Sequence, residues 1–321
     1  MVANISLTNP SLMFRFVLVT LFIFSNSCFA QNKKPVADLK NPRTILWKIS
    51  GKDCKQPSYL LGTMHVIKGD WAYAFPEIKH AIDSTEFLLS EAFTTSPTVE
   101  KIPKNKRLRA ISILTSEQYK TLDSFFVARV DDGIKNNPEA EEMTIAEMRS
   151  AILLTLVVNK SGANGITEFM DLDIFKLFLK NGRKADMLDR VPTVDFDSSS
   201  IENAKRFFSG TIASIKGSDK PDWNIYHNDS LDKNIETYTQ FKMDYKLEEE
   251  DSGIGEPYHE FDYVPLKVRN RNWIPKIEKN ISEKSCLIAV GFGHLKYKTG
   301  VISLLRERGY TVEPVPLTII K

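Results

Sequence analysis

Two histidines of this sequence occupy the same local pattern. Each lies three residues after a glycine that ends an apolar run: YLLGTMH ends at His65, and LIAVGFGH ends at His294. Glu91 has a comparable position, directly after the apolar run FLLS. Two imidazoles and a carboxylate are a familiar ligand set for a divalent metal ion with an open position for water. Because such a metal acidifies its water and polarises a carbonyl group, the three residues predict a hydrolytic centre, and Glu91 is its candidate base if it is not a ligand.

Each histidine also has a structural explanation. Glycine and histidine fall at this spacing by chance in many chains, so a single match favours a core or surface role. The remaining histidines, His80, His227 and His259, lie in a predicted helix or in polar stretches. The sequence contains no helical zinc-protease motif, no G-x-S-x-G elbow and no phosphate loop. Repetition of the pattern at both ends of the chain is what favours the metal centre.

These residues can meet only if the elements before them share one sheet. Short, fully apolar strands are usually buried on both faces of a parallel sheet, and ligands of open α/β sheets bind beyond the carboxyl ends of the strands. A glycine at a strand end lets the chain turn sharply or approach a ligand closely. Strands at 58–61 and 286–290 would therefore hold His65 and His294 over one crevice.

The remaining pattern predicts strands alternating with helices at both ends of the chain. We expect further strands at 44–49, 87–93, 185–188 and 310–315, and helices at 71–84, 116–130, 144–158, 165–180, 201–215, 268–281 and 301–308. This order is typical of an α/β core with a helical middle insertion, here at about 110–245. We expect residues 44–321 to form a single domain.

The composition is that of an ordinary globular protein. The chain has 321 residues, of which 42% are hydrophobic and 26% are charged, and its formal net charge is +2. This balance lacks the basic excess that indicates a nucleic-acid partner and the acidic excess typical of disordered chains. We therefore expect a peptide or small-molecule partner rather than nucleic acid.

The first thirty residues have the features of a secretory signal peptide. Residues 13–24 form an apolar run with Arg15 near its start, and a small-x-small ending predicts cleavage after Ala30. The alternative is a lipoprotein anchored at Cys28, although the polar residues before Cys28 match an apolar lipobox poorly. We expect an exported protein, periplasmic or extracellular, with a flexible leader at 31–43 and no transmembrane span in the mature chain.

Signal cleavage would leave Cys54 and Cys286 as the cysteines of the mature chain. Each precedes one of the apolar runs that lead to the histidines. An even number of cysteines in an oxidising compartment is compatible with a disulfide, but two unlinked thiols fit equally well. The sequence leaves both open because it does not define the distance between them.

Several motifs together carry a family resemblance. They are GTMH ending at His65, FLLSE ending at Glu91, RNRNW at 269–273, and VGFGHL followed by GVISLLRERGYTVEPV. Over about 45–95 and 265–316 the chain closely resembles the TraB/GumN family, which includes the Tiki Wnt-inactivating metalloproteases and the pheromone-shutdown protein PrgY. The resemblance implies an EreA/ChaN-like (Tiki-type) fold, related to erythromycin esterase, with paired β-sheets, flanking helices and a cleft.

The resemblance also implies roles for individual residues. His65, His294 and Glu91 match the residues that Tiki members require for a divalent-metal-dependent peptidase activity. Arg269 and Asn270 match the family's Arg-Asn pair and are candidates for binding substrate. Arg269 is suited to a substrate carboxylate or a tetrahedral oxyanion, and pairing with Glu91 or another buried acid is its structural alternative.

Two positions depart from the family pattern. Leu188-Asp189 is followed by Arg190 where family members often have Leu-Glu with a later Gln, and Tyr297 replaces a glycine three residues after His294. We expect the first change to weaken the middle part of the site. We expect the second to narrow or reshape the mouth of the cleft.

Three functions fit these observations. The first is an exported hydrolase that cleaves peptide or amide bonds with a water bound to a divalent metal ion such as Mn, Co or Zn. The second is a PrgY-like binding protein that sequesters a peptide or another small molecule without turnover. The third is an ester hydrolase, implied by the kinship with erythromycin esterase. The first is our working hypothesis.

Overall fold

A computed structural model describes residues 42–96, 108–145, 147–148, 151–152, 155, 169–189, 198–217, 228–251 and 265–318. The predicted signal peptide and its cleavage site lie outside these residues, as does most of the predicted leader. His227 and His259 also lie outside the described residues.

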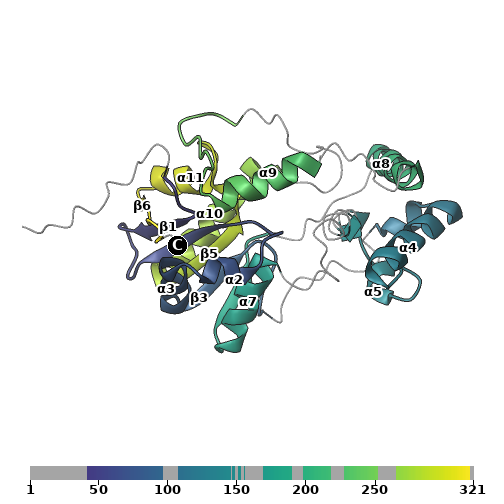
Figure 1. The fold of residues 1–321 in the computed structure, drawn as a ribbon. Coiled ribbons are helices and arrows are strands. Elements are labelled where there is room, and N and C mark those ends of the chain that lie inside the picture. The colour runs from purple at the N-terminus through teal and green to yellow at the C-terminus, as the bar shows by residue number, and fades with distance from the viewer. Residues whose placement is uncertain are drawn as a thin grey trace, which may run out of the picture. The chain divides into compact units, whose positions relative to one another are not determined.

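The described residues contain one six-stranded mixed sheet with the strand order β4-β3-β5-β2-β1-β6 (Figure 1). The strands β4, β3, β5 and β2 are parallel, whereas β1 is antiparallel to both β2 and β6. The predicted α/β class is confirmed, but the described residues show one sheet where the family resemblance implied two. The strands are β1 (Leu46–Ser50), β2 (Ser58–Thr63), β3 (Phe87–Ser90), β4 (Lys184–Met187), β5 (Cys286–Gly291) and β6 (Thr311–Pro314).

The helices largely follow the predicted pattern. The helix predicted at 71–84 is divided in two, because Pro76 lacks a backbone N–H and begins a new helix. The α-helices are α2 (Gly69–Tyr73), α3 (Pro76–Ser84), α4 (Ser116–Val130), α5 (Pro138–Glu141), α7 (Met170–Lys180), α8 (Ser198–Gly217), α9 (Asn228–Thr239), α10 (Leu266–Glu283) and α11 (Val301–Glu307). The described residues also form the 3-10 helices η2 (Ala110–Ile113) and η3 (Phe292–Leu295).

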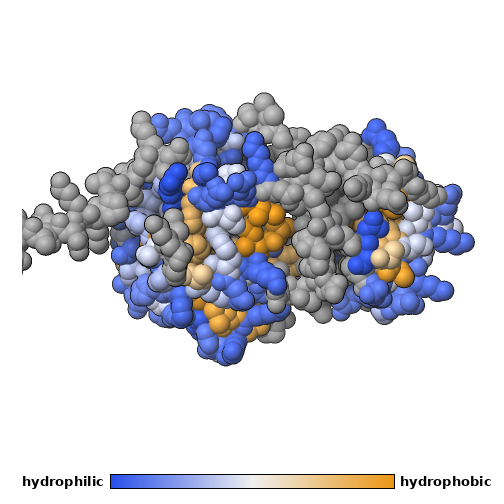
Figure 2. Space-filling view, in the orientation of Figure 1, coloured by the Kyte–Doolittle hydropathy of each residue, from blue (hydrophilic) through white to orange (hydrophobic). Residues whose placement is uncertain are grey.

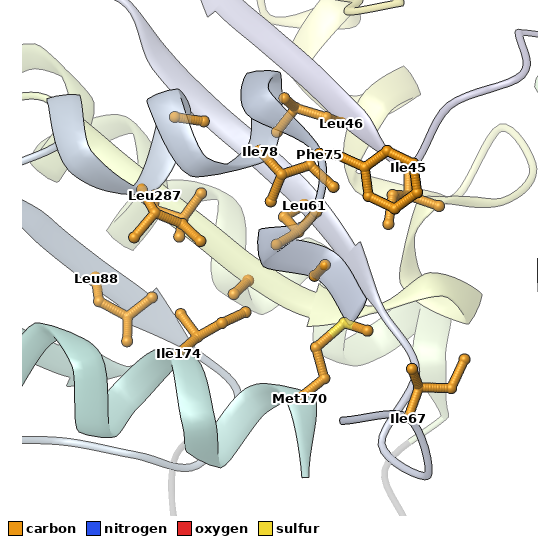
Figure 3. Close-up of a cluster of buried hydrophobic side chains, with 14 of the residues drawn as sticks. Ile45, Leu46, Leu61, Ile67, Phe75, Ile78, Leu88, Met170, Ile174 and Leu287 are labelled. Atoms are coloured by element: carbon orange, nitrogen blue, oxygen red, sulfur yellow. The ribbon is translucent and has the colours of Figure 1, made fainter. Parts of the chain in front are cut away.

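Alternate residues of the strands face opposite sides of the sheet, and helices cover both sides. On one side Leu61 of β2 and Leu287 of β5 pack with Ile174 of α7 (Figure 3). On the other side their chain neighbours, Leu60 and Ile288, pack in a cluster with residues of α10 and α11. Burial on both faces explains why these strands read as continuous apolar runs. It contributes about 1.5–3 kcal/mol for each large aliphatic side chain.

Helices α4, α5 and α8 and the 3-10 helix η2 form a separate hydrophobic cluster, which includes Leu122 and Phe208. A capping box begins the helix predicted at 144–158, because the Thr144 N–H donates to Glu147 and the Glu147 N–H donates to Thr144 Oγ1. Strand β4 and helix α7 fall within the segment predicted as an insertion, yet β4 joins the sheet and α7 packs on it. The limits of the domain and of its insertion stay predictions.

Cys54 and Cys286 are free thiols in the structure, and Cys286 is buried at the start of β5. Burial raises the pKa of Cys286 to about 12 and also raises the pKa of Cys54. Because the thiolate is the reactive form, neither thiol is placed to act as a nucleophile at neutral pH.

The visible face is mainly hydrophilic, with separate hydrophobic patches (Figure 2). The large hydrophobic side chains exposed among the described residues, Val127, Leu179 and Val268, lie on three different helices. Within the described part of the chain, no helix has both the length and the apolar character needed to cross a bilayer.

Candidate functional site

Strands β2, β3 and β5 bring the three predicted metal ligands to one edge of the sheet. The strands are parallel neighbours, with β5 between β2 and β3. Thr63, the last residue of β2, pairs with Gly291, the last residue of β5. His65, Glu91 and His294 follow the ends of these strands and line one cavity of about 580 Å³.

The lining of this cavity combines polar and apolar side chains. Arg269 of α10 lines it together with the three predicted ligands, and residues of α9 contribute to it. A concave site of this size with a few polar groups among apolar ones is typical of small-molecule and peptide side-chain binding. The apolar part of the lining consists of Met64, Tyr238, Met243, Leu266 and Phe292.

Glu91 is a buried acid whose two carboxylate oxygens are both engaged. Oε1 accepts from the Gly291 backbone N–H at 2.7 Å, and Oε2 accepts from Arg269 Nη2 at 2.5 Å. His294 Nε2 lies 3.5 Å from Oε2. Burial acts to raise the pKa of Glu91, but His294, Arg269 and His65 outweigh burial and hold that pKa well below its usual range. Glu91 is therefore ionised at neutral pH.

His294 is held by helix α10. Its Nδ1 donates to Asn270 Oδ1 at 2.5 Å, and its ring packs on Trp273 with the ring centroids 4.2 Å apart. Asn270 Nδ2 donates to the carbonyl oxygens of His294 and Thr299. Burial lowers the pKa of His294 and outweighs the opposing effect of Glu91, which favours a neutral ring. Asn270 is 2% exposed, orients His294 and is not among the residues that line the cavity, and its contact with substrate stays a prediction.

His65 is held by Asp171 in the first turn of α7. Its Nδ1 donates to Asp171 Oδ2, and Asp171 Oδ1 accepts from Thr63 Oγ1 at 2.5 Å. The His65 side chain is 54% exposed, whereas that of Asp171 is 9% exposed. Burial opposes protonation of His65, but the charge and hydrogen bond of Asp171 outweigh it and raise the pKa of His65 to about 9.

Arg269 connects two carboxylates. Besides Glu91, it binds Asp189, with Nε 3.0 Å from Oδ1 and Nη2 2.6 Å from Oδ2. Asp189 Oδ1 also accepts from Trp273 Nε1 at 2.9 Å. Pairing with nearby acids, the structural alternative for Arg269, is therefore observed. Its partner Asp189 is one of the positions at which the chain departs from the family pattern. Within the described residues, Arg269 binds these two carboxylates through Nε and Nη2.

Tyr297 does not line the cavity, although the sequence predicted an effect on its mouth. Its φ is 67°, a left-handed conformation that favours glycine. This conformation explains why glycine suits the position in the family. The Tyr297 N–H donates to the Tyr245 carbonyl at 2.8 Å, which helps to hold the strained backbone.

The fit to a metal ion depends on donor type and on the space above Gly291. A methyl group at Gly291 would lie 3.2 Å from Glu91 Oε1 and 3.6 Å from His65 Nε2, so both atoms face that space. Both histidines donate Nδ1–H to a side-chain oxygen, which is usual for metal-ligating histidines and turns Nε2 toward a metal; because the pKa of His65 is raised to about 9, a metal would have to displace the proton on its Nε2. The residues therefore fit a divalent ion in donor type.

The side chains of His65, Glu91 and His294 are not, however, in a ligating arrangement. Over the described ranges, no three His, Cys, Asp or Glu side chains are placed to hold a metal ion together. The physical reason is visible at Glu91, whose oxygens bind Arg269 and the Gly291 N–H instead.

The glycines of the two motifs predict different mutational effects. A methyl group at Gly62 would lie 2.9 Å from the buried Leu295 Cδ2, so Gly62→Ala should cost about 1–3 kcal/mol of stability through overpacking. Gly291 has φ −53° and ψ 139°, which alanine adopts freely. Gly291→Ala should therefore stay within about 1 kcal/mol of the original stability, while its methyl group weakens Co²⁺ binding roughly tenfold.

Urea unfolding and a Co²⁺ titration measure both effects, and each variant is the control for the other. Unchanged Co²⁺ binding in Gly291→Ala would show that the space above Gly291 is not part of a metal site.

Together these observations define a class of protein: a mixed α/β protein with two histidines, a glutamate and an arginine around a cavity at the carboxyl edge of its parallel strands. Compared with sequence models of known families, residues 45–314 match the TraB/PrgY/gumN family. The match covers most of the chain, so the chain belongs to the TraB/PrgY/gumN family. No curated protein and no solved structure matches it in the other two comparisons.

Proposed function

We propose that the chain is a metal-dependent hydrolase of peptide or amide bonds. The proposal rests on one observation, the common cavity into which His65 Nε2 and Glu91 face beside His294. In this proposal the three side chains hold a divalent ion such as Mn, Co or Zn. When bound, such an ion would acidify water and polarise the carbonyl group of the scissile bond.

Other groups of the chain have distinct roles in this proposal. Asn270 orients the His294 ring through its Nδ1 atom. Arg269 Nη1 donates a hydrogen bond to the substrate carbonyl oxygen, where negative charge develops during attack on the carbon. The apolar lining, which includes Met243 and Phe292, holds the neighbouring part of the substrate and excludes water.

A sequestering protein without turnover is the second candidate. It is favoured by the engagement of both Glu91 oxygens, which leaves this carboxylate poorly disposed to take a proton from water. The apolar lining of the cavity would supply affinity for a peptide or another small molecule. An ester hydrolase would use the same centre and differs only in substrate.

Metal analysis with parallel substrate panels tests the proposal. The chain is expressed with export, loaded with Mn²⁺, Co²⁺ or Zn²⁺, and assayed against a peptide library and an ester panel. We expect one metal ion per chain and peptide cleavage that a chelator removes and added metal restores. Metal binding without cleavage would support the sequestering protein, and cleavage of esters alone would support the ester hydrolase. Absence of both metal binding and cleavage would refute the proposal.

We also propose that the protein is exported, with cleavage after Ala30. This proposal rests on the apolar run and small-x-small ending of the first thirty residues. The intact mass of the exported chain tests it, because a chain that starts at Gln31 and one acylated at Cys28 differ clearly in mass.

A further inference from the structure

The first turn of helix α7 contacts both ends of the loop that carries His65. Near the start of the loop, Asp171 accepts hydrogen bonds from Thr63 Oγ1 and His65 Nδ1. At the end of the loop, Asp173 Oδ2 accepts from the Gly69 N–H at 2.8 Å. Two carboxylates from one helical turn therefore hold the chain on either side of the histidine.

Helix α7 is a firm support for these carboxylates. Met170, its first residue, is fully buried in the core beside the sheet (Figure 3). The approach of the loop is close, because a methyl group at Gly69 would lie only 2.5 Å from the Asp173 Cβ atom. A carboxylate in the first turn is also favoured by the positive end of the helix dipole. The first turn of α7 can therefore fix the positions of the groups that Asp171 and Asp173 bind.

The His65 ring needs such a support. Its side chain is 54% exposed, so the packing around it leaves room for other rotamers. Asp171 receives the His65 Nδ1 proton on one oxygen while Thr63 holds its other oxygen. This arrangement points the opposite ring nitrogen, Nε2, toward the space above Gly291.

We propose that Asp171 is a positioning residue that fixes the orientation of the His65 ring for ligand binding, with Thr63 fixing Asp171. The consequence for metal affinity rests on the proposed function, whereas the orientation of the ring does not. Groups that orient metal-ligating histidines in this way typically change metal affinity by about 10–100-fold when they are removed.

Asp171→Asn and Asp171→Ala test the proposal, with Asp173→Asn and Asp173→Ala as matched controls. The control pair removes the same charge from the same helical turn; the hydrogen bond that the Asp173 carboxylate makes among the described residues is to the Gly69 N–H, and the amide oxygen of Asp173→Asn can still accept it. Thermal unfolding identifies any variant that fails to fold, and Asp171→Asn, which conserves shape, keeps the test decisive if Asp171→Ala fails.

Two readouts are compared, the hydrogen-bonded Nδ1–H proton of His65 in NMR spectra and the Co²⁺ dissociation constant. The NMR signal is assigned by its loss in His65→Ala. We expect Asp171→Asn to shift this signal upfield and to weaken Co²⁺ binding about tenfold, and Asp173→Asn to leave both unchanged.

Equal effects of Asp171→Asn and Asp173→Asn would overturn the proposal, because charge alone would then explain them. Absence of the Nδ1–H signal from the unsubstituted protein would also overturn it. If that signal is present and responds to Asp171→Asn, but the unsubstituted protein binds no Co²⁺, the orientation stands and only the proposed metal-dependent function fails.

Discussion

Alanine in place of His65 or His294 is expected to weaken the binding of a divalent metal ion by roughly 100-fold or more. Each substitution removes an imidazole nitrogen from the shared cavity, and the remaining carboxylate is already bound to Arg269. Isothermal titration with Mn²⁺, Co²⁺ and Zn²⁺ measures the change. His65→Ala leaves the nearly buried Asp171 carboxylate without its imidazole partner, and His294→Ala removes a side chain of a residue that is only 3% exposed, so each loss should cost about 1–3 kcal/mol.

His80→Ala is the control for this pair. His80 lies on α3, away from the cavity lining, and its ring makes an edge contact with Tyr59. The His80→Ala variant should bind metal with the same affinity as the unsubstituted protein. Stoichiometric metal binding that survives in both His65→Ala and His294→Ala would mean that these rings are not ligands, and the hydrolytic proposal would have to be abandoned.

Glu91→Gln is expected to reduce hydrolysis by about 10³-fold while the protein stays folded. Glutamine retains the shape of the side chain and an oxygen for the Gly291 N–H, but it removes the charge that faces Arg269 and His294. Arg269 keeps Asp189 as a partner, so no unpaired buried charge is created. The expected loss of stability is therefore only about 1–3 kcal/mol.

Glu86→Gln is the matched control, because Glu86 precedes β3 where Glu91 follows it. Among the described residues its side chain accepts from Ser285 Oγ, and it does not line the cavity. Initial rates on the best substrate of the panel and urea unfolding curves compare the two variants. If Glu91→Gln unfolds the protein, Glu91 is primarily structural; if its rate is unchanged, Glu91 has no part in the chemistry.

The elements near the site could be predicted because their signals are local. A run of apolar residues ending in glycine identified β2 and β5, and FLLS identified β3. The same logic located His65, Glu91 and His294, since a side chain just beyond a parallel strand must lie at the sheet's carboxyl edge. The antiparallel pairing of β1 was not predicted, because alternation within one strand says nothing about the direction of its neighbour.

The sequence did not predict the residues that orient the side chains of the site. The sequence does not single out Asp171, and Asp189 stands out in it only as a departure from the family pattern. A carboxylate in the first turn of a helix is ordinary on its own, so Asp171 carried no local signal, and Asp189 lies two residues after the short strand β4. Asn270 was recognised as a candidate for binding substrate. The structure adds that its amide orients the His294 ring and is not among the groups that line the cavity.

The sequence by itself determined where strands and helices form and which side chains stand at their ends, because both depend on residues close together in the chain. Only the tertiary structure decided which groups those side chains meet. His65 finds Asp171 across 106 residues, and Arg269 finds Asp189 across 80. Such partners are selected by packing of the whole fold: burial makes an unpaired polar group costly, and the order of the strands determines which acid or amide is near enough to pair with it.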